Sequence, residues 1–173
     1  MEFEFNWQNK EANFGLPETK EIDGGTHFTI EMMLRHAGKF VMVRRPEGYP
    51  GHQLSPKAKD YPEGCLYFCH DLPRWGESLP EAVKRVVASQ IGAEVQDIRI
   101  LDLNMQTYPD DQHEGNRQWA ITAYVAVELT GLPEINDKVT EVRVFDEASI
   151  PDDMGWWEQD ELRDFISQFK EKF

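Results

Sequence analysis

One stretch of this chain carries its own start and stop signals for a helix. Ser78 and Glu81 form a Ser-x-x-Glu capping box, in which each side chain can bond the other residue's backbone N–H. Pro80 falls in the first turn, where a missing N–H costs little, and Gly92 can take the left-handed conformation that ends helices. The apolar residues between these signals recur at steps of three and four: Leu79, Val83, Val86, Val87 and Ile91. The pattern predicts a helix over residues 78–91 with Ser78 as its N-cap and one broad apolar face.

The segment from Asp71 to Ala93 resembles the Nudix box. The family pattern is a glycine, five residues, a glutamate, seven residues, and then Arg-Glu-aliphatic-x-Glu-Glu-x-Gly-aliphatic. The residues that match this pattern or its common loop form are Gly76, Glu77, Ser78, Arg85, Val87 and Gly92. The resemblance implies an α/β (α+β) fold, a Nudix-like α/β/α sandwich around a mixed β-sheet. It also implies that the matched residues serve the scaffold, with Glu77 and Arg85 forming an ion pair between loop and helix.

The metal-binding half of the box is missing. In the family, three helix glutamates face the diphosphate and hold magnesium or manganese, but here those positions are Val86, Ser89 and Gln90, and the opening glycine is Asp71. Mg²⁺ is held by carboxylate oxygens together with substrate phosphates. Residues at i, i+3 and i+4 share one helix face, so we expect these three uncharged side chains to lie on the cleft face. The sequence therefore predicts that no divalent cation binds the helix at these positions.

Length and composition predict one domain. A chain of 173 residues that is 40% hydrophobic can bury a full core. We expect a Nudix-like domain over residues 26–173 after an N-terminal extension over residues 1–25. The net charge of −14 argues against nucleic acid or an anionic membrane as the main partner. No targeting segment or long apolar run is present in the sequence, which predicts a cytoplasmic protein, and the oligomeric state stays open.

The two cysteines predict buried thiols. Cys65 and Cys69, followed by His70, do not make a disulfide framework. Cys-x-x-x-Cys-His is also not a zinc spacing, and a second ligand pair is absent from the sequence. We expect both thiols on one face of a strand over residues 65–69.

The remaining elements are predicted from alternation and from turn residues. The extension carries alternating Phe3, Phe5 and Trp7, which suit a strand, and residues 46–64 form a loop long enough to be a binding insertion. Strands are expected over residues 26–35, 40–43, 65–69, 94–107, 118–129 and 139–145, and a C-terminal helix over 158–169. This is the Nudix order of elements.

Several side chains are candidate ligand contacts. Arg44 and Arg45 end the first hairpin, where Nudix proteins often place an arginine near substrate phosphates, although one of them is expected to be solvated. Arg74 precedes the box loop and is a further candidate. Tyr108 and Trp119 flank a polar loop and could stack on a nucleobase, with core packing as the alternative for Trp119. Trp156 and Trp157 could close a pocket or seal the last helix, and the loop residues that could replace missing ligands are Asp110, Asp111, His113 and Glu114.

Two functions remain open. In the first, the chain is a Nudix-fold binding or interaction module that has lost hydrolysis, needs no cofactor, and holds a nucleotide or another diphosphate ligand. In the second, it is a divergent metal-dependent hydrolase of a nucleoside diphosphate-linked substrate. Asp71, Glu77 and Glu81 would then be catalytic and would hold Mg or Mn. The loss of all three helix glutamates favours the first.

Overall fold

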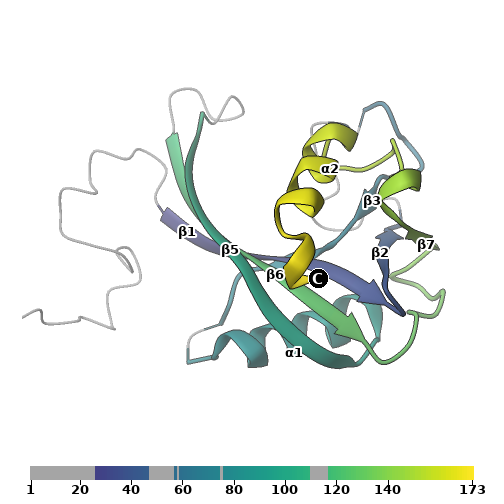
Figure 1. The fold of residues 1–173 in the computed structure, drawn as a ribbon, viewed down its shortest axis with the longest axis horizontal. Helices are drawn as coiled ribbons and strands as arrows, with labels where there is room; N and C mark the ends of the chain where they lie inside the picture. The colour runs from purple at the N-terminus through teal and green to yellow at the C-terminus, as the bar shows by residue number, and fades with distance from the viewer. Residues whose placement is uncertain (1–25, 47–56, 58, 75, 110–116) are drawn as a thin grey trace, which may run out of the picture.

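A computed structural model describes residues 26–46, 57, 59–74, 76–109 and 117–173, with only the backbone described at 26–27, 106–109 and 117–120. In this described part of the chain, seven strands form one mixed sheet, with helix α1 on one side and helix α2 on the other (Figure 1). The strands are β1 (Thr26–His36), β2 (Lys39–Arg44), β3 (Leu66–Tyr67), β4 (Cys69–Asp71), β5 (Val95–Pro109), β6 (Arg117–Leu129) and β7 (Glu141–Phe145). The helices are α1 (Leu79–Ile91), α2 (Gln159–Gln168) and the short 3-10 turns η3 (Glu147–Ser149) and η4 (Lys170–Lys172).

The sheet has the order β3-β2-β1-β6-β5, with β4 paired to β1 and β7 paired to β2. Strands β1 and β6 run parallel, and the other strand pairs are antiparallel. The β1–β2 hairpin turns through Ala37 and Gly38, whose φ angles of 50° and 79° are the left-handed values that a tight hairpin turn needs. The predicted hairpin and the mixed sheet are therefore confirmed.

Helix α1 confirms the sequence prediction closely. Ser78 is its N-cap, Gly92 ends it with a φ of 67°, and the Ser78 N–H donates to Glu81 Oε2 at 2.8 Å. Its apolar face is buried in the core (Ala82, Val83, Val86, Val87 and Ile91). Each valine or isoleucine side chain removed from water in this way contributes on the order of 1.5–3 kcal/mol. The helix is thus positioned by its caps and held by the sheet.

The segment from Cys65 to Cys69 differs from the single strand that was expected. Strand β3 pairs with β2 through Tyr67 opposite Val43, whereas β4 pairs with β1 through Cys69 opposite Met32. The chain changes partner at Phe68, because two different sheet edges offer free backbone groups on either side of it. Both cysteines are buried, as predicted, and burial raises the pKa of the Cys69 thiol to about 12.

The last helix closes the other side of the sheet. Leu162 and Ile166 of α2 are buried, and Phe165 lies 5.0 Å from Tyr124 of β6 between ring centroids. Trp157 packs against both of these rings, so it seals the helix against the sheet. No helix in the described part of the chain is long and apolar enough to cross a membrane.

Several expectations fall on residues that are not described. These are the N-terminal extension with Phe3, Phe5 and Trp7, most of the 46–64 loop, and the loop residues Asp110, Asp111, His113 and Glu114. The described residues of the 46–64 loop form an ion pair and a hydrogen bond with the segment before α2. Lys57 Nζ lies 2.9 Å from Glu158 Oε2, and the Tyr61 hydroxyl donates to the Asp152 carbonyl at 3.3 Å.

Candidate functional site

The box loop is built around Arg85. Its Nε donates to Glu77 Oε1 at 2.5 Å and its Nη2 to Glu77 Oε2 at 2.9 Å, so the predicted loop–helix ion pair is present. The same guanidinium donates to Asp71 Oδ2 at 3.3 Å and to the Leu72 carbonyl at 3.0 Å. Glu77 also accepts the Arg74 N–H at 2.7 Å. Hydrogen bonding from Arg85 holds the pKa of the Glu77 carboxyl below its ordinary value.

The other candidate metal carboxylates also have scaffold partners. Glu81 accepts from both the hydroxyl and the N–H of Ser78, and these bonds lower the pKa of its carboxyl. Asp71 accepts the Leu72 N–H at 2.8 Å in addition to its bond from Arg85. Within the described ranges, no group of three or more His, Cys, Asp or Glu side chains is arranged to hold a metal ion.

The helix positions that carry glutamate in the family do not share one open face. The Val86 side chain is wholly buried in the core, so the expectation that it lies on the cleft face is wrong. An aliphatic side chain at this position gains more from burial than from facing solvent. Ser89 is exposed and its hydroxyl donates to the Val86 carbonyl at 3.1 Å, while Gln90 is partly buried.

Gln90 is held by a buried arginine. Arg45 Nη2 donates to Gln90 Oε1 at 2.6 Å and Arg45 Nη1 to the Gln90 carbonyl at 3.4 Å. Gln90 Nε2 in turn donates to the His70 carbonyl at 2.8 Å. Arg45 is only 4% exposed, and no local sequence signal indicates this contact because the two partners are 45 residues apart.

The neighbouring Arg44 ties four parts of the chain together. Its Nε donates to Glu141 Oε2 of β7 at 2.8 Å, and its other nitrogens bond the Asp153 carboxylate and the Gly64 carbonyl. Neither Arg44 nor Arg45 is solvated, which corrects the expectation for this pair. Arg74 has an exposed position beside the box loop. Tyr108 and Trp119 lie on adjacent strands, but their side chains fall outside the described residues, so base stacking stays a prediction.

A sequence model of the NUDIX domain matches residues 27–165. This chain belongs to the NUDIX family. No curated protein gives a significant match to this NUDIX sequence. Among solved structures, the chain is similar to a mutant form of the Bacillus subtilis pyrophosphohydrolase BsRppH, with a TM-score of 0.57, 14% identity, and coverage of 83% of this chain and 81% of that one.

Two further structures resemble this NUDIX protein. One is a UDP-X diphosphatase, with a TM-score of 0.55, 11% identity and coverage of 86% of this chain, although the chain spans only 64% of that protein. The other is a MutT NUDIX hydrolase from Burkholderia pseudomallei, with a TM-score of 0.53, 15% identity, and coverage of 83% of this chain and 97% of that one. At these identities the likeness shows the fold alone.

Trp156 and Trp157, which were expected to close a pocket or to seal the last helix, also contact His70 and Glu31, and this aromatic and polar cluster on the NUDIX domain was not predicted from the sequence. Trp156 is 44% exposed and meets the His70 ring edge-on at 6.4 Å between centroids. His70 pairs in the sheet with Glu31, whose Oε1 accepts from Trp157 Nε1 at 3.3 Å. Burial raises the pKa of the Glu31 carboxyl, against the opposing effects of His70 and Trp157. The pairing of β1 with β4 creates this cluster, so only the fold reveals it.

Proposed function

We propose that this NUDIX protein has lost metal-dependent diphosphate hydrolysis and binds a nucleotide or another diphosphate-bearing small molecule. The contact between Arg45 and Gln90 is the observation that carries the proposal. The positively charged guanidinium of Arg45 places its Nη2 2.6 Å from Gln90 Oε1. Gln90 occupies a position at which the family pattern has a metal-binding glutamate. A divalent cation beside it would be repelled, and no carboxylate at Val86, Ser89 or Gln90 would offset the cost of dehydrating that cation.

The alternative is a divergent hydrolase that uses Mg or Mn. It would have to recruit Asp71, Glu77 and Glu81. Each of these carboxylates already bonds Arg85 or the helix N-terminus, so metal binding would compete with contacts that hold the box loop. The arrangement therefore supports scaffold roles for all three.

The ligand class follows from the surroundings of the box. The exposed Trp156 indole beside His70 offers an apolar platform of the kind that stacks on a nucleobase. Arg74 adds an exposed cation next to the box loop, which suits a phosphate group. A small ligand with few charges fits a chain of net charge −14 better than a nucleic acid does. The diphosphatase and pyrophosphohydrolase names belong to the similar proteins, and they point to the same class.

The direct test measures hydrolysis and binding separately. We expect no phosphate release above the protein-free rate from nucleoside triphosphates, dinucleoside polyphosphates or ADP-ribose with millimolar Mg²⁺ or Mn²⁺. Calorimetry in EDTA should still detect binding of at least one of these compounds. Metal-dependent release that Glu77→Gln or Glu81→Gln abolishes would instead establish the divergent hydrolase. Absence of binding to all three classes would overturn the ligand proposal.

A gain-of-metal variant sharpens this test. Restoring all three glutamates would place Val86→Glu in the core, where an unpaired buried charge destabilises the fold. We therefore combine Ser89→Glu and Gln90→Glu with Arg45→Met, which removes the competing cation and keeps an apolar stem. This variant should bind Mn²⁺ more tightly than the matched variant that retains Arg45, in which Gln90→Glu pairs with the guanidinium. Equal Mn²⁺ affinity in the two variants would show that Arg45 does not exclude the metal.

A further inference from the structure

Strand β5 forms one edge of the sheet and exposes apolar side chains there. Among the described residues it pairs with β6 alone. Ile100 is 61% exposed, Leu103 56% and Met105 59%, and we call these three residues the β5 stripe. Neighbouring large apolar side chains on the surface of a protein mark a place where another segment binds.

The β5 stripe lies on one face of the sheet. The residues opposite it on β6 are Val125, Ala123 and Ile121, which alternate along the strand and so share a face. Tyr124 lies on the other face, because it packs on Phe165 of α2. The stripe is therefore on the α1 side of the sheet (Figure 1). Its three β6 partners are buried, so the apolar layer on this side extends past the part that is covered.

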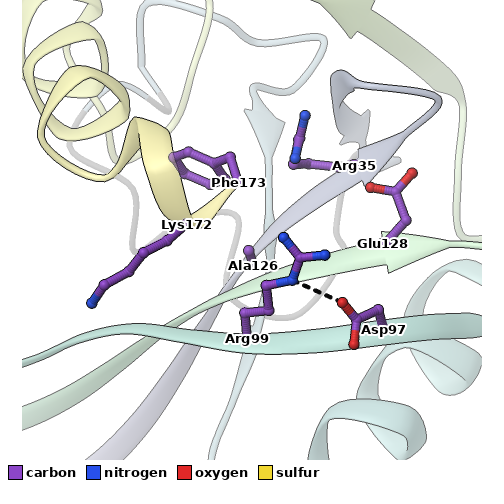
Figure 2. A pocket seen from close by; sticks show the side chains of 7 residues that line it. All are labelled: Arg35, Asp97, Arg99, Ala126, Glu128, Lys172 and Phe173. Atoms are coloured by element: carbon purple, nitrogen blue, oxygen red, sulfur yellow. Dashed lines mark hydrogen bonds and ion pairs between the residues drawn. The ribbon is translucent and has the colours of Figure 1, made fainter.

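The opposite face of β5 is polar, and the first half of its edge is protected. Asp97 and Arg99 bond each other there and line a small cavity together with Lys172 (Figure 2). Lys172 Nζ donates to the Leu101 carbonyl at 2.6 Å, and the register of β5 shifts at two positions before residue 103. Bulges and lysines of this kind hinder pairing with a further strand. Regular pairing is therefore open only along residues 102–109.

The sequence before β1 contains a segment with a matching pattern. Residues 1–25 lie outside the described part of the chain, and within residues 2–8 apolar and polar residues alternate strictly. The apolar members are Phe3, Phe5 and Trp7. This period of two is that of a strand with one apolar face, which is also the pattern of the β5 stripe. Each aromatic side chain can bury about 150–250 Å².

The tether between this segment and the sheet is long enough. Thr26 at the start of β1 lies opposite Trp119 of β6, which lies opposite Thr107 of β5. Neighbouring strands are about 4.8 Å apart, so a strand added to β5 would lie roughly 15 Å from Thr26. Residues 8–25 can extend over roughly 55–60 Å. Such a tether gives the segment an effective concentration of about millimolar at its own β5 edge. A second copy would instead bring the same net charge of −14, which opposes association.

We propose that residues 3–7 add to the β5 edge of their own chain as a further strand, beside residues 102–107. The backbone N–H and C=O groups of the two segments pair, and the three aromatic side chains cover the β5 stripe. The polar residues that alternate with them face the α2 side, as the polar residues of β5 do. The inference is independent of the function proposed for the box.

The test measures hydrogen–deuterium exchange of the full chain by mass spectrometry. Amides of residues 3–7 should exchange severalfold more slowly than in a free synthetic peptide of residues 1–10. Phe5→Ser should remove this protection and also speed exchange along residues 102–107. Phe14→Ser is the matched control, because it replaces an aromatic residue of the same extension outside the alternating run, and it should change neither.

The same contact is tested from β5. Leu103→Ser should also release residues 3–7, whereas Ile135→Ser, at another exposed apolar residue, should not. The double variant of Phe5 and Leu103 should exchange no faster than either single variant, since both changes remove one interaction. Phe5→Ser alone decides the matter if Leu103→Ser fails to fold.

Three results would overturn the proposal. The first is exchange of residues 3–7 as fast as in the free peptide. The second is protection that survives Phe5→Ser. The third is protection that rises with protein concentration, because the segment that covers β5 would then belong to a second copy.

Discussion

The surroundings of each arginine, rather than its place in the sequence, decide what it does. Arg44 and Arg45 are adjacent in the chain, yet one joins β2 to β7 and the other is buried against α1. Arg85 holds the box loop through two carboxylates and a carbonyl. A guanidinium offers five donors in a rigid fork, so it can join several segments at once. Arg44, Arg45 and Arg85 therefore act mainly by connecting separate segments of the fold.

Substitution of Arg85 tests this role. Arg85→Ala should lower Tm by about 2–4 °C, because the box loop loses its connection to α1. Glu77→Gln alone should have a smaller effect, and the double variant should be little worse than Arg85→Ala, since both changes remove one interaction. Arg163→Ala breaks an exposed pair within α2 and should change Tm by less than about 1 °C. A fall in Tm no larger than that of this control would contradict the structural role.

At the scale of elements, helix α1 depends mainly on local signals. The capping box begins it, the left-handed Gly92 ends it, and the apolar spacing selects the buried face. The 65–69 segment depends on contacts distant in sequence, because its first half pairs with β2 and its last residue pairs with β1. Local signals suffice for an element when its hydrogen bonds close within the segment, as they do in a helix.

The end of α1 offers a direct measurement. Gly92→Ala should destabilise the protein by about 1 kcal/mol, because alanine disfavours a φ of 67° while its Cβ would meet no heavy atom within 4 Å. Thermal unfolding should show a Tm lower by about 2–4 °C. Gly131→Ala is the matched control, since Gly131 also has open space but no left-handed φ. Equal Tm values for the two variants would show that a side chain at position 92 does not strain the backbone.

At the scale of the whole molecule, the Arg44 network connects parts that are distant in sequence. Arg44 joins β2 to β7, to the chain before β3 and to the segment before α2 through Glu141, Gly64 and Asp153. Arg143 also donates to Glu141, at 2.8 Å. Burial alone would raise the pKa of the Glu141 carboxyl, but the bonds from Arg44 and Arg143 hold it below the ordinary value of 4.5. The charged form of Glu141 is therefore the one that the fold favours.

This shift predicts a dependence of stability on pH. A carboxyl with a lowered pKa in the folded state contributes stability above the unfolded pKa of 4.5, and that contribution is lost as pH falls through the folded pKa. Glu141→Gln should reduce the free energy of unfolding at neutral pH, and its difference from the natural protein should shrink below pH 4.5. Urea unfolding at several pH values measures this. Glu134→Gln, at an exposed loop position, is the matched control for the loss of one carboxylate. A difference that stays constant with pH would refute the assignment.

The sequence by itself determined the features whose causes are local. These include α1 with both caps, the tight β1–β2 turn, and the Glu77–Arg85 pair, whose partners are eight residues apart. Alternation also placed the bounds of β5 and β6 close to where the structure has them. The sequence also shows that the three helix glutamates are absent, because the metal-ligand positions can be compared one by one with the family pattern.

Only the tertiary structure decided which residues meet across long separations. The parallel pairing of β1 with β6 joins segments that local patterns treat separately, and so does the contact of Arg45 with Gln90. Periodicity can show that a side chain prefers the interior, but it does not show which residues that side chain contacts there. Burial and charge pairing depend on the final packing, and so the chemistry of this site was decided by the fold.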